Sequence, residues 1–248
     1  MPAITSSRYT VSAGWNDAPH LSEKAKAELL SSIQPHLREA RSIGTPSMGA
    51  GAIYPIALSE HIVQPFPIPA YWPRAYGFDV GWNRTAALWC AKNPDTGVYY
   101  FYAEHYRAHS VPTVHATSIK ARGNWIRGAI DPASRNRDIK DGERIIEDYN
   151  LAGLKLVPAI NAVEAGIYTV WSLLEGGRIK VFASLTNFAA EYRLYRRDEK
   201  GKIIKKFDHL MDCGRYVIMT WDKVQSLQPM NFTNRGVETG PADMRAGI

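Results

Sequence analysis

Three aspartates stand at places in the sequence where a carboxylate is uncommon unless it is paired or binds a metal ion. Asp79 lies inside the apolar run FDVGW, Asp131 closes the run GAID before a proline, and Asp212 lies within FDHLMDCGRY. Carboxylate oxygens are hard ligands suited to Mg²⁺ or Mn²⁺. Two such ions held side by side activate a water and stabilise the leaving oxygen of a phosphodiester. The sequence therefore predicts a site for two divalent cations, Mg²⁺ or Mn²⁺, with phosphodiester hydrolysis as its chemistry.

Each of these aspartates also has a simpler explanation. Asp79 can be a turn residue that is hydrogen-bonded to backbone, Asp131 can cap a loop, and Asp212 can be an exposed helix residue. The combination of all three in one chain favours the metal site. If they gather, the carboxylates repel one another, and we expect some of them to bind protons more readily than isolated ones.

The segment around Asp212 offers two more candidates. Asp208 lies four residues and His209 three residues before Asp212, so on a helix each shares a face with it. We predict Asp208 as a further metal ligand and His209 as a catalytic side chain that ligates metal or receives a proton. The alternative for Asp208 is the N-cap of the helix, and the alternative for His209 is an ordinary surface position.

The elements that must position these side chains form an α/β pattern. Three apolar strands joined by tight turns predict an antiparallel meander over 75–82, 85–92 and 98–107, and helices and strands then alternate. The expected helices are 111–122, 138–152, 162–174 and 208–220, and the further strands are 125–131, 154–159 and 178–183. The three aspartates converge only if the first strand lies beside the fourth. That arrangement predicts a ribonuclease H-like mixed sheet, an antiparallel meander plus parallel strands, flanked by helices.

The remaining sequence suggests four segments. Residues 1–63 include a helix that Ser22 can cap, and 64–74 hold prolines at 65, 67, 69 and 73, which is typical of a linker. We expect the α/β domain over 75–221 and a flexible tail over 222–248. A hairpin is expected over 192–207.

Composition and charge limit the function classes. The chain of 248 residues is 45% hydrophobic, with no apolar run long enough to cross a membrane and no signal peptide, so we expect a cytoplasmic protein. Its two cysteines are too few for a disulfide framework. The net charge of +6 leans toward polyanionic partners. Solvated surface charge is the alternative to DNA contact for the basic side chains that we single out: Arg84, Arg135, Arg137, Arg196, Arg197 and Lys202.

The motifs GFDVGWNRTAAL, GAIDPASRNRD and KKFDHLMDCGRY together resemble the C-terminal nuclease domain of large terminase subunits from tailed bacteriophages and prophages. The resemblance spans 76–216. It implies an endonuclease that cuts concatemeric double-stranded viral DNA during genome packaging, in the host bacterial cytoplasm, with Asp79, Asp131 and Asp212 as metal ligands. It implies that His209 is an auxiliary residue and that the basic hairpin at 193–206 contacts or gates DNA. By analogy, the portal protein and the small terminase subunit are partners, and we expect the isolated domain to be monomeric.

The N-terminal stretch WNDAPHLSEKAKAELLSSI, with the following residues to 56, resembles the end of a terminase ATPase domain. No GxxxxGK[ST] phosphate loop occurs in the sequence. We therefore expect residues 1–63 to be a remnant of that domain, and the chain to carry the cutting activity without the motor, either as an isolated domain or as the product of a truncated gene.

Other functions remain open at this point. Asp79-Val80-Gly81 also fits the phosphate loop of actin-like or sugar-kinase ATPases, but their second glycine-rich motif is not found in the sequence. A catalytically silent DNA-binding or docking module from a decayed prophage is a second alternative. Other ribonuclease H-like nucleases, such as junction resolvases, share the metal chemistry and lack the ATPase-like segment. Gly214 departs from the family pattern, because helix-favouring residues are usual there.

Overall fold

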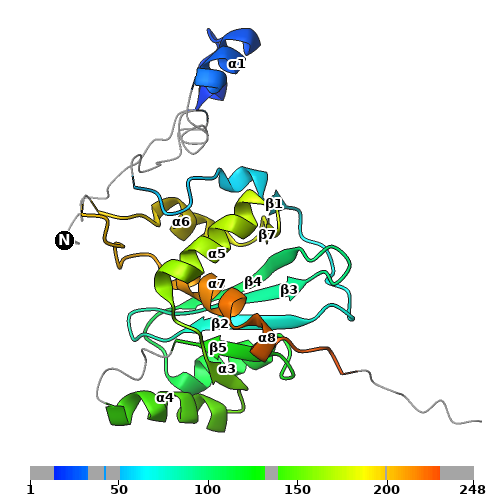
Figure 1. Ribbon diagram of the computed structural model, residues 1–248, viewed down its shortest axis with the longest axis vertical. Coiled ribbons are helices and arrows are strands. Elements are labelled where there is room, and N and C mark those ends of the chain that lie inside the picture. Colours follow the sequence, from blue (N-terminus) through cyan, green and yellow to red (C-terminus); the bar gives the residue numbers. More distant parts are fainter. Residues whose placement is uncertain (1–13, 33–41, 43–50, 132–138, 199, 230–248) are drawn as a thin grey trace, which may run out of the picture.

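The computed structural model describes residues 14–32, 42, 51–131, 139–198 and 200–229 (Figure 1). Its helices are η1 (Trp15–Asp17), α1 (Glu23–Ser32), η2 (Leu58–Glu60), α3 (Pro112–Lys120), α4 (Ile139–Leu151), α5 (Val163–Glu175), α6 (Thr186–Leu194), α7 (His209–Met219) and α8 (Trp221–Val224). Its strands are β1 (Ile62–Val63), β2 (Arg74–Asp79), β3 (Thr85–Lys92), β4 (Tyr99–Arg107), β5 (Arg127–Ile130), β6 (Leu156–Pro158) and β7 (Ile179–Phe182). Within these described ranges, no helix is long and apolar enough to cross a bilayer.

Seven strands form one mixed sheet in the order β1-β7-β4-β3-β2-β5-β6. The meander β2-β3-β4 is antiparallel, as predicted, and β5 pairs with β2 in parallel, with Tyr76 opposite Gly128. The remaining pairs, β5 with β6, β4 with β7 and β1 with β7, are also parallel. The first strand of the meander, β2, therefore lies beside β5, the strand that follows the meander, which is the ribonuclease H-like arrangement expected from the aspartates.

Side-chain alternation along the central strands builds a core on each face of the sheet. Ala75 of β2 packs with the helices α5, α6 and α7, whereas Tyr76 and Phe78 pack with α3 and α4. Figure 1 shows these two helical layers on opposite sides of the strands. Because the period of a strand is two, Asp79 has the same parity as Ala75 and projects on the side of α7.

Helix α7 lies against β2 at a distance that only glycine permits. A Cβ placed on Gly77 would stand 1.9 Å from the carbonyl oxygen of Cys213, which is backbone and cannot rotate away. Helix α7 is enclosed on its other sides as well, since every residue from Leu210 to Ile218 is buried. The Cys213 thiol donates to the Ala86 carbonyl at 3.3 Å, and Cys90 is also buried and free, so both cysteines serve packing.

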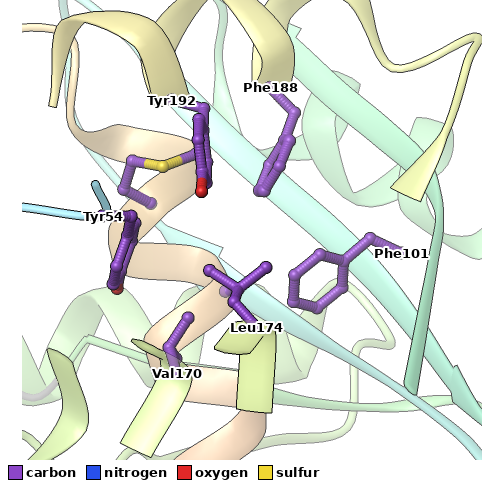
Figure 2. Close-up of a pocket in the computed structure, with 8 residues that line it drawn as sticks. Tyr54, Phe101, Val170, Leu174, Phe188 and Tyr192 are labelled. Atoms are coloured by element: carbon purple, nitrogen blue, oxygen red, sulfur yellow. The ribbon is translucent and has the colours of Figure 1, made fainter. Parts of the chain in front are cut away.

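A small cavity remains on this face of the sheet. Figure 2 shows the side chains around it, which come from β4, α5, α6, α7 and the segment before η2, and it measures about 10 Å³. Gly214 of α7 borders it, with room for a methyl group, because an added Cβ would meet Leu88 and Phe101 at 3.5 Å. The glycine that departs from the family pattern thus faces the core, where it borders this void.

The structured region differs from the expected segments at both ends. Residues 52–63 pack onto the sheet: Tyr54 stacks with Tyr192, and Ile62–Val63 pairs with β7 as strand β1. At the other end α8 extends past Trp221, and Ser226 exchanges two backbone hydrogen bonds with Arg74. Residues on both sides of the expected 75–221 domain therefore contact its sheet.

Two other local predictions can be compared with the structure. Ser22 does cap α1, since its hydroxyl accepts from Ala25 N at 3.2 Å. The hairpin is shorter than 192–207, because α6 continues to Leu194 and the antiparallel bridge joins Arg197 to Ile203. The hydrophobic residues of 188–195 pack on α7 and the Tyr54 segment, and this burial favours helix over hairpin.

We predict opposite effects for alanine at Gly77 of β2 and at Gly214 of α7. Gly77→Ala forces α7 away from the sheet, and overpacking against backbone should cost about 3 kcal/mol or more of unfolding free energy. Gly214→Ala adds a methyl group at ordinary contact distance and improves helix propensity, so it should be neutral or stabilising by up to about 1 kcal/mol. Urea denaturation followed by circular dichroism measures both. Equal stabilities of the two variants would contradict the packing described here.

Candidate active site

The carboxyl ends of three parallel strands meet at one edge of the sheet, where open α/β sheets bind ligands. Asp79 is the last residue of β2, Asp131 follows β5 directly, and Asn161 lies just beyond β6. The backbone amide of Asp131 donates to the Phe78 carbonyl at 3.1 Å, which fixes the ends of β2 and β5 side by side. Two of the three predicted aspartates are thus neighbours because their strands are neighbours.

Helix α7 brings the remaining acidic candidates to the same edge. His209 opens the helix, and its Nδ1 lies 2.8 Å from Oδ2 of Asp79, across 130 residues of sequence. Asp212 lies in the first turn, where the helix dipole favours a carboxylate. Asp208 occupies the N-cap position, but its side chain makes no capping hydrogen bond. The Asp208 carboxylate therefore does not act as the helix N-cap, which was the alternative role considered for it.

Cationic side chains face these carboxylates. Lys205 Nζ lies 3.2 Å from Oδ2 of Asp208 and 3.1 Å from Oδ2 of Asp212. The other oxygen of Asp212 accepts from the Arg215 guanidinium at 3.0 Å. The two oxygens of Asp212 therefore contact different cations, one on the connection that precedes α7 and one on α7 itself.

The start of α7 is anchored from the protein interior by a buried carboxylate. Glu191 of α6 accepts from the Leu210 amide at 2.6 Å and from the Tyr106 hydroxyl at 2.5 Å. Helix α6 is in turn capped by Glu104 of β4, which accepts from the amides of Asn187 at 3.0 Å and Phe188 at 2.9 Å. Hydrogen bonds thus run from the sheet through α6 to the first turn of α7, which carries the site.

A family model described as the terminase RNaseH-like domain matches residues 76–220. The chain belongs to the terminase RNase H-like domain family. Two similar curated proteins are the large terminase subunits of Enterobacteria phage LP7 and Salmonella phage P22. Each is 33% identical over 213 residues, which are 82% of this chain and 44% or 42% of the relative, so the chain spans less than half the length of either.

Solved structures agree with this assignment. The nuclease domain of the P22 large terminase is 29% identical, with a TM-score of 0.68 over 73% of this chain and 97% of that domain. The large terminase of a thermophilic bacteriophage, solved in complex with ADP and 22% identical, matches with a TM-score of 0.57 over 84% of this chain and 54% of its own. The nuclease domain of bacteriophage SPP1 with bound Mn, 16% identical, reaches 0.50 over 66% of this chain and 96% of its own. At their lower identities, the last two matches show a shared fold.

Electrostatics couple the three aspartates of this terminase domain. Burial raises the pKa of Asp79, the hydrogen bond from His209 opposes this, and the nearby charges of Asp212 and Asp131 raise it further. The predicted repulsion is therefore present, although burial is the larger cause. The hydrogen bond to Asp79 raises the pKa of His209 above 6.5, because the imidazolium is the better donor.

The donor set suits a hard divalent cation, because it is composed of carboxylate oxygens. Among the side chains that the structure describes, no three from His, Cys, Asp and Glu lie close enough together to enclose an ion. The oxygens of Asp79 and Asp212 are instead turned toward His209, Lys205 and Arg215. Metal binding at this edge would therefore require the exposed ammonium of Lys205 to move away from Asp208 and Asp212.

The basic residues predicted to contact DNA lie in different environments. Arg84 precedes β3 and packs its guanidinium 4.4 Å from the centre of the Tyr106 ring, beside the site. Arg197 is ion-paired with Glu164 of α5 at 2.5 Å. Lys202 is exposed in the hairpin, Arg196 is partly buried there, and Arg135 and Arg137 lie outside the described residues.

Sequence reasoning missed four residues that complete the site: Asn161, Glu191, Lys205 and Arg215. Asn161 follows a strand end, so the rule that singled out Asp131 also applies to it. Arg215 lies three residues after Asp212, a spacing that places both on one helix face. Glu191 offered no signal, since its partners Tyr106 and Leu210 are distant in sequence and adjacent only in the fold.

We predict that Asp79→Asn lowers the pKa of His209 in the metal-free protein, because the asparagine removes the charge that favours the imidazolium. In the unchanged chain this interaction contributes stability fully below pH 6.5, the unfolded value, and loses it as pH rises through the higher folded pKa. An NMR titration of the His209 ring in EDTA measures the shift. Asp222→Asn, on the exposed side of α8, is the control and should leave the His209 titration unchanged. The same titration curve in Asp79→Asn and the unchanged chain would contradict the pairing.

Proposed function

We propose that this chain is a divalent-metal-dependent endonuclease that cuts concatemeric double-stranded viral DNA during genome packaging. The observation that carries the proposal is the meeting of Asp79, Asp131 and the first turn of α7 at one edge of the sheet, in a chain of the terminase RNase H-like family. A carboxylate set of this kind has no evident structural purpose, because burying like charges together costs stability.

Asp79, Asp131 and Asp212, with Asp208 as a further ligand, are the residues that would hold two Mg²⁺ or Mn²⁺ ions. The related SPP1 nuclease domain carries Mn in its solved structure, which supports this choice of ion. When bound, such a pair supplies an activated water and stabilises the leaving 3′-oxygen of the phosphodiester. His209, hydrogen-bonded to Asp79 and partly exposed, would accept or return a proton at Nε2.

Basic side chains around the site would hold the phosphate backbone. Arg84 beside Tyr106 and Lys202 and Arg196 on the hairpin are the described candidates, with Arg135 and Arg137 on the segment after Asp131. Arg197 is already paired with Glu164, so its contribution would require that exposed pair to open. Contacts of this kind position DNA without reading its sequence, so we expect little base selectivity.

The wider role is proposed on family grounds, since the chain spans less than half of its curated relatives. We propose that residues 1–63 derive from the end of an ATPase domain, with 52–63 packed against the nuclease sheet, and that 64–74 link the two domains. We further propose the portal protein and the small terminase subunit as partners, a monomeric isolated domain, and action in the cytoplasm of the host bacterium. The remainder of the tail, from 230 onward, is a candidate for docking to those partners.

We predict that Asp79→Ala, Asp131→Ala and Asp212→Ala each abolish Mn²⁺-dependent cleavage of supercoiled plasmid. Each substitution removes an oxygen ligand. Circular dichroism checks the fold, above all for Asp212→Ala, which leaves the buried Arg215 without its carboxylate partner. Asp222→Ala removes an exposed carboxylate from α8 and should cut like the unchanged chain, and EDTA should stop all cutting. Undiminished cleavage by one of the three variants would remove that residue from the site. A protein that binds DNA but does not cut it in the presence of any divalent metal would indicate the silent docking module instead.

We predict steep loss of DNA affinity with salt, because phosphate contacts release counterions. Lys202→Ala should weaken binding to unrelated duplexes alike and reduce the slope of log affinity against log salt by about 1. Lys155→Ala is the matched control, since it removes an exposed lysine at the opposite end of β6. Fluorescence anisotropy in EDTA measures both variants without cleavage. A flat salt dependence in the unchanged chain would count against a DNA-cutting function.

A further inference from the structure

Arg215 of α7 is a buried cation whose side chain packs closely against helix α5. Its relative exposure is 1%, and its guanidinium lies 4.6 Å from the centre of the Tyr216 ring. Helix α5 makes room for its stem at Gly166, where an added Cβ would stand 2.6 Å from Cγ and 2.7 Å from Cδ of Arg215. A buried charge is costly unless it is paired and hydrogen-bonded, so the partners of Arg215 indicate its purpose.

Those partners connect two of the acidic residues. One terminal nitrogen of Arg215 donates to Oδ1 of Asp212 at 3.0 Å, and the other donates to Oδ1 of Asn161 at 2.7 Å. The amide nitrogen of Asn161 points to Oδ1 of Asp131 at 3.5 Å, a long hydrogen bond. The guanidinium is a rigid planar fork, so its two contacts have a fixed relative geometry. The side chains therefore form a continuous bridge from Asp131 through Asn161 and Arg215 to Asp212.

The segment that carries Asn161 is itself fixed to the strands and to α7. The Ala159 amide donates to the Ile130 carbonyl at 2.8 Å, and the Ile160 amide donates to the Thr220 hydroxyl at 2.9 Å. Both ends of the bridge thus rest on regular structure. Asn161 is nevertheless exposed, so its replacement by a smaller residue leaves no cavity in the core.

We propose that Arg215 and Asn161 are positioning residues that set the orientation of Asp212 and Asp131 for divalent cations. The inference rests on the proposed function of the same site. The two cations that contact Asp212 have different roles. Lys205, with 58% of its side chain exposed, can move away, whereas Arg215 is buried and held in place. Arg215 therefore keeps Oδ1 of Asp212 occupied and leaves Oδ2 as the ligand oxygen.

The test measures Mn²⁺ binding by calorimetry without DNA, alongside plasmid cleavage against Mn²⁺ concentration and thermal unfolding in EDTA. Asn161→Ala should weaken Mn²⁺ binding roughly 10-fold to 100-fold, as is usual for groups that orient metal ligands. Its cleavage curve should move to higher Mn²⁺ by a similar factor, with only a small fall of the melting temperature in EDTA, because Arg215 loses one hydrogen bond. Asn124→Ala, an exposed asparagine in the turn before β5, is the matched control and should match the unchanged chain.

Arg215→Lys gives a second, independent measurement. It keeps the positive charge but has a single nitrogen, which cannot contact Asp212 and Asn161 in the same way. It should weaken Mn²⁺ binding, and adding Asn161→Ala to it should cause little further loss, because the two act as one bridge. If Arg215→Lys does not fold, Asn161→Ala decides the question alone.

The possible failures are distinct. Mn²⁺ affinity in Asn161→Ala equal to that of the unchanged chain would overturn the positioning role while leaving the nuclease function intact. If Asn161→Ala lowers the free energy of unfolding in EDTA by as much as it lowers the free energy of Mn²⁺ binding, Asn161 has a merely structural role. That result would also overturn the inference. Failure of the unchanged chain both to bind Mn²⁺ and to cut DNA would overturn the proposed function and this inference with it.

Discussion

The site depends on one backbone contact, the approach of α7 to strand β2 at Gly77. The absence of a Cβ there lets the carbonyl of Cys213 lie against the strand. This contact sets where the first turn of α7 lies, and therefore places His209 within hydrogen-bond distance of Asp79. Interiors are packed as densely as crystals, so a shift of α7 by the width of one methyl group would separate the residues of the site.

Hydrogen bonds accepted by a half-buried carboxylate, Glu104, and a buried one, Glu191, then fix the remaining freedom of the helix. Glu104 caps α6 from the sheet, and Glu191 of α6 holds the Leu210 amide at the start of α7. Burial raises the pKa of Glu191, and its bonds from Tyr106 and from the Leu210 amide oppose this. A carboxylate without hydrogen-bond partners is costly in a protein interior. Moving either helix end away from its carboxylate would therefore be unfavourable. The same rule shapes the site, where each described acidic residue faces a cation, an imidazole or an amide.

Charge compensation in this protein has two forms that differ in exposure. Arg215 is enclosed by α5 and α7 and bridges to Asn161, whereas Lys205 reaches Asp208 and Asp212 from the solvent side. Exposed ion pairs contribute little to stability and exchange readily, whereas breaking a buried pair is strongly unfavourable. An acidic cluster with one fixed and one exchangeable cation keeps its shape and still has oxygens to offer to a divalent ion.

The sequence alone determined the mixed sheet and the three candidate aspartates, because strand periodicity, turn residues and a charge inside an apolar run are local signals. It also predicted that β2 lies beside β5, since only that order joins Asp79 to Asp131. Tertiary structure decided the rest. Residues 52–63 join the sheet through apolar packing that no local pattern marks, and α6 replaces the start of the expected hairpin for the same reason. Asn161, Glu191, Lys205 and Arg215 acquire their roles from partners brought together by the fold. A side chain's hydrogen-bond partner is a property of three-dimensional distance, which the sequence specifies only through the complete packing of the chain.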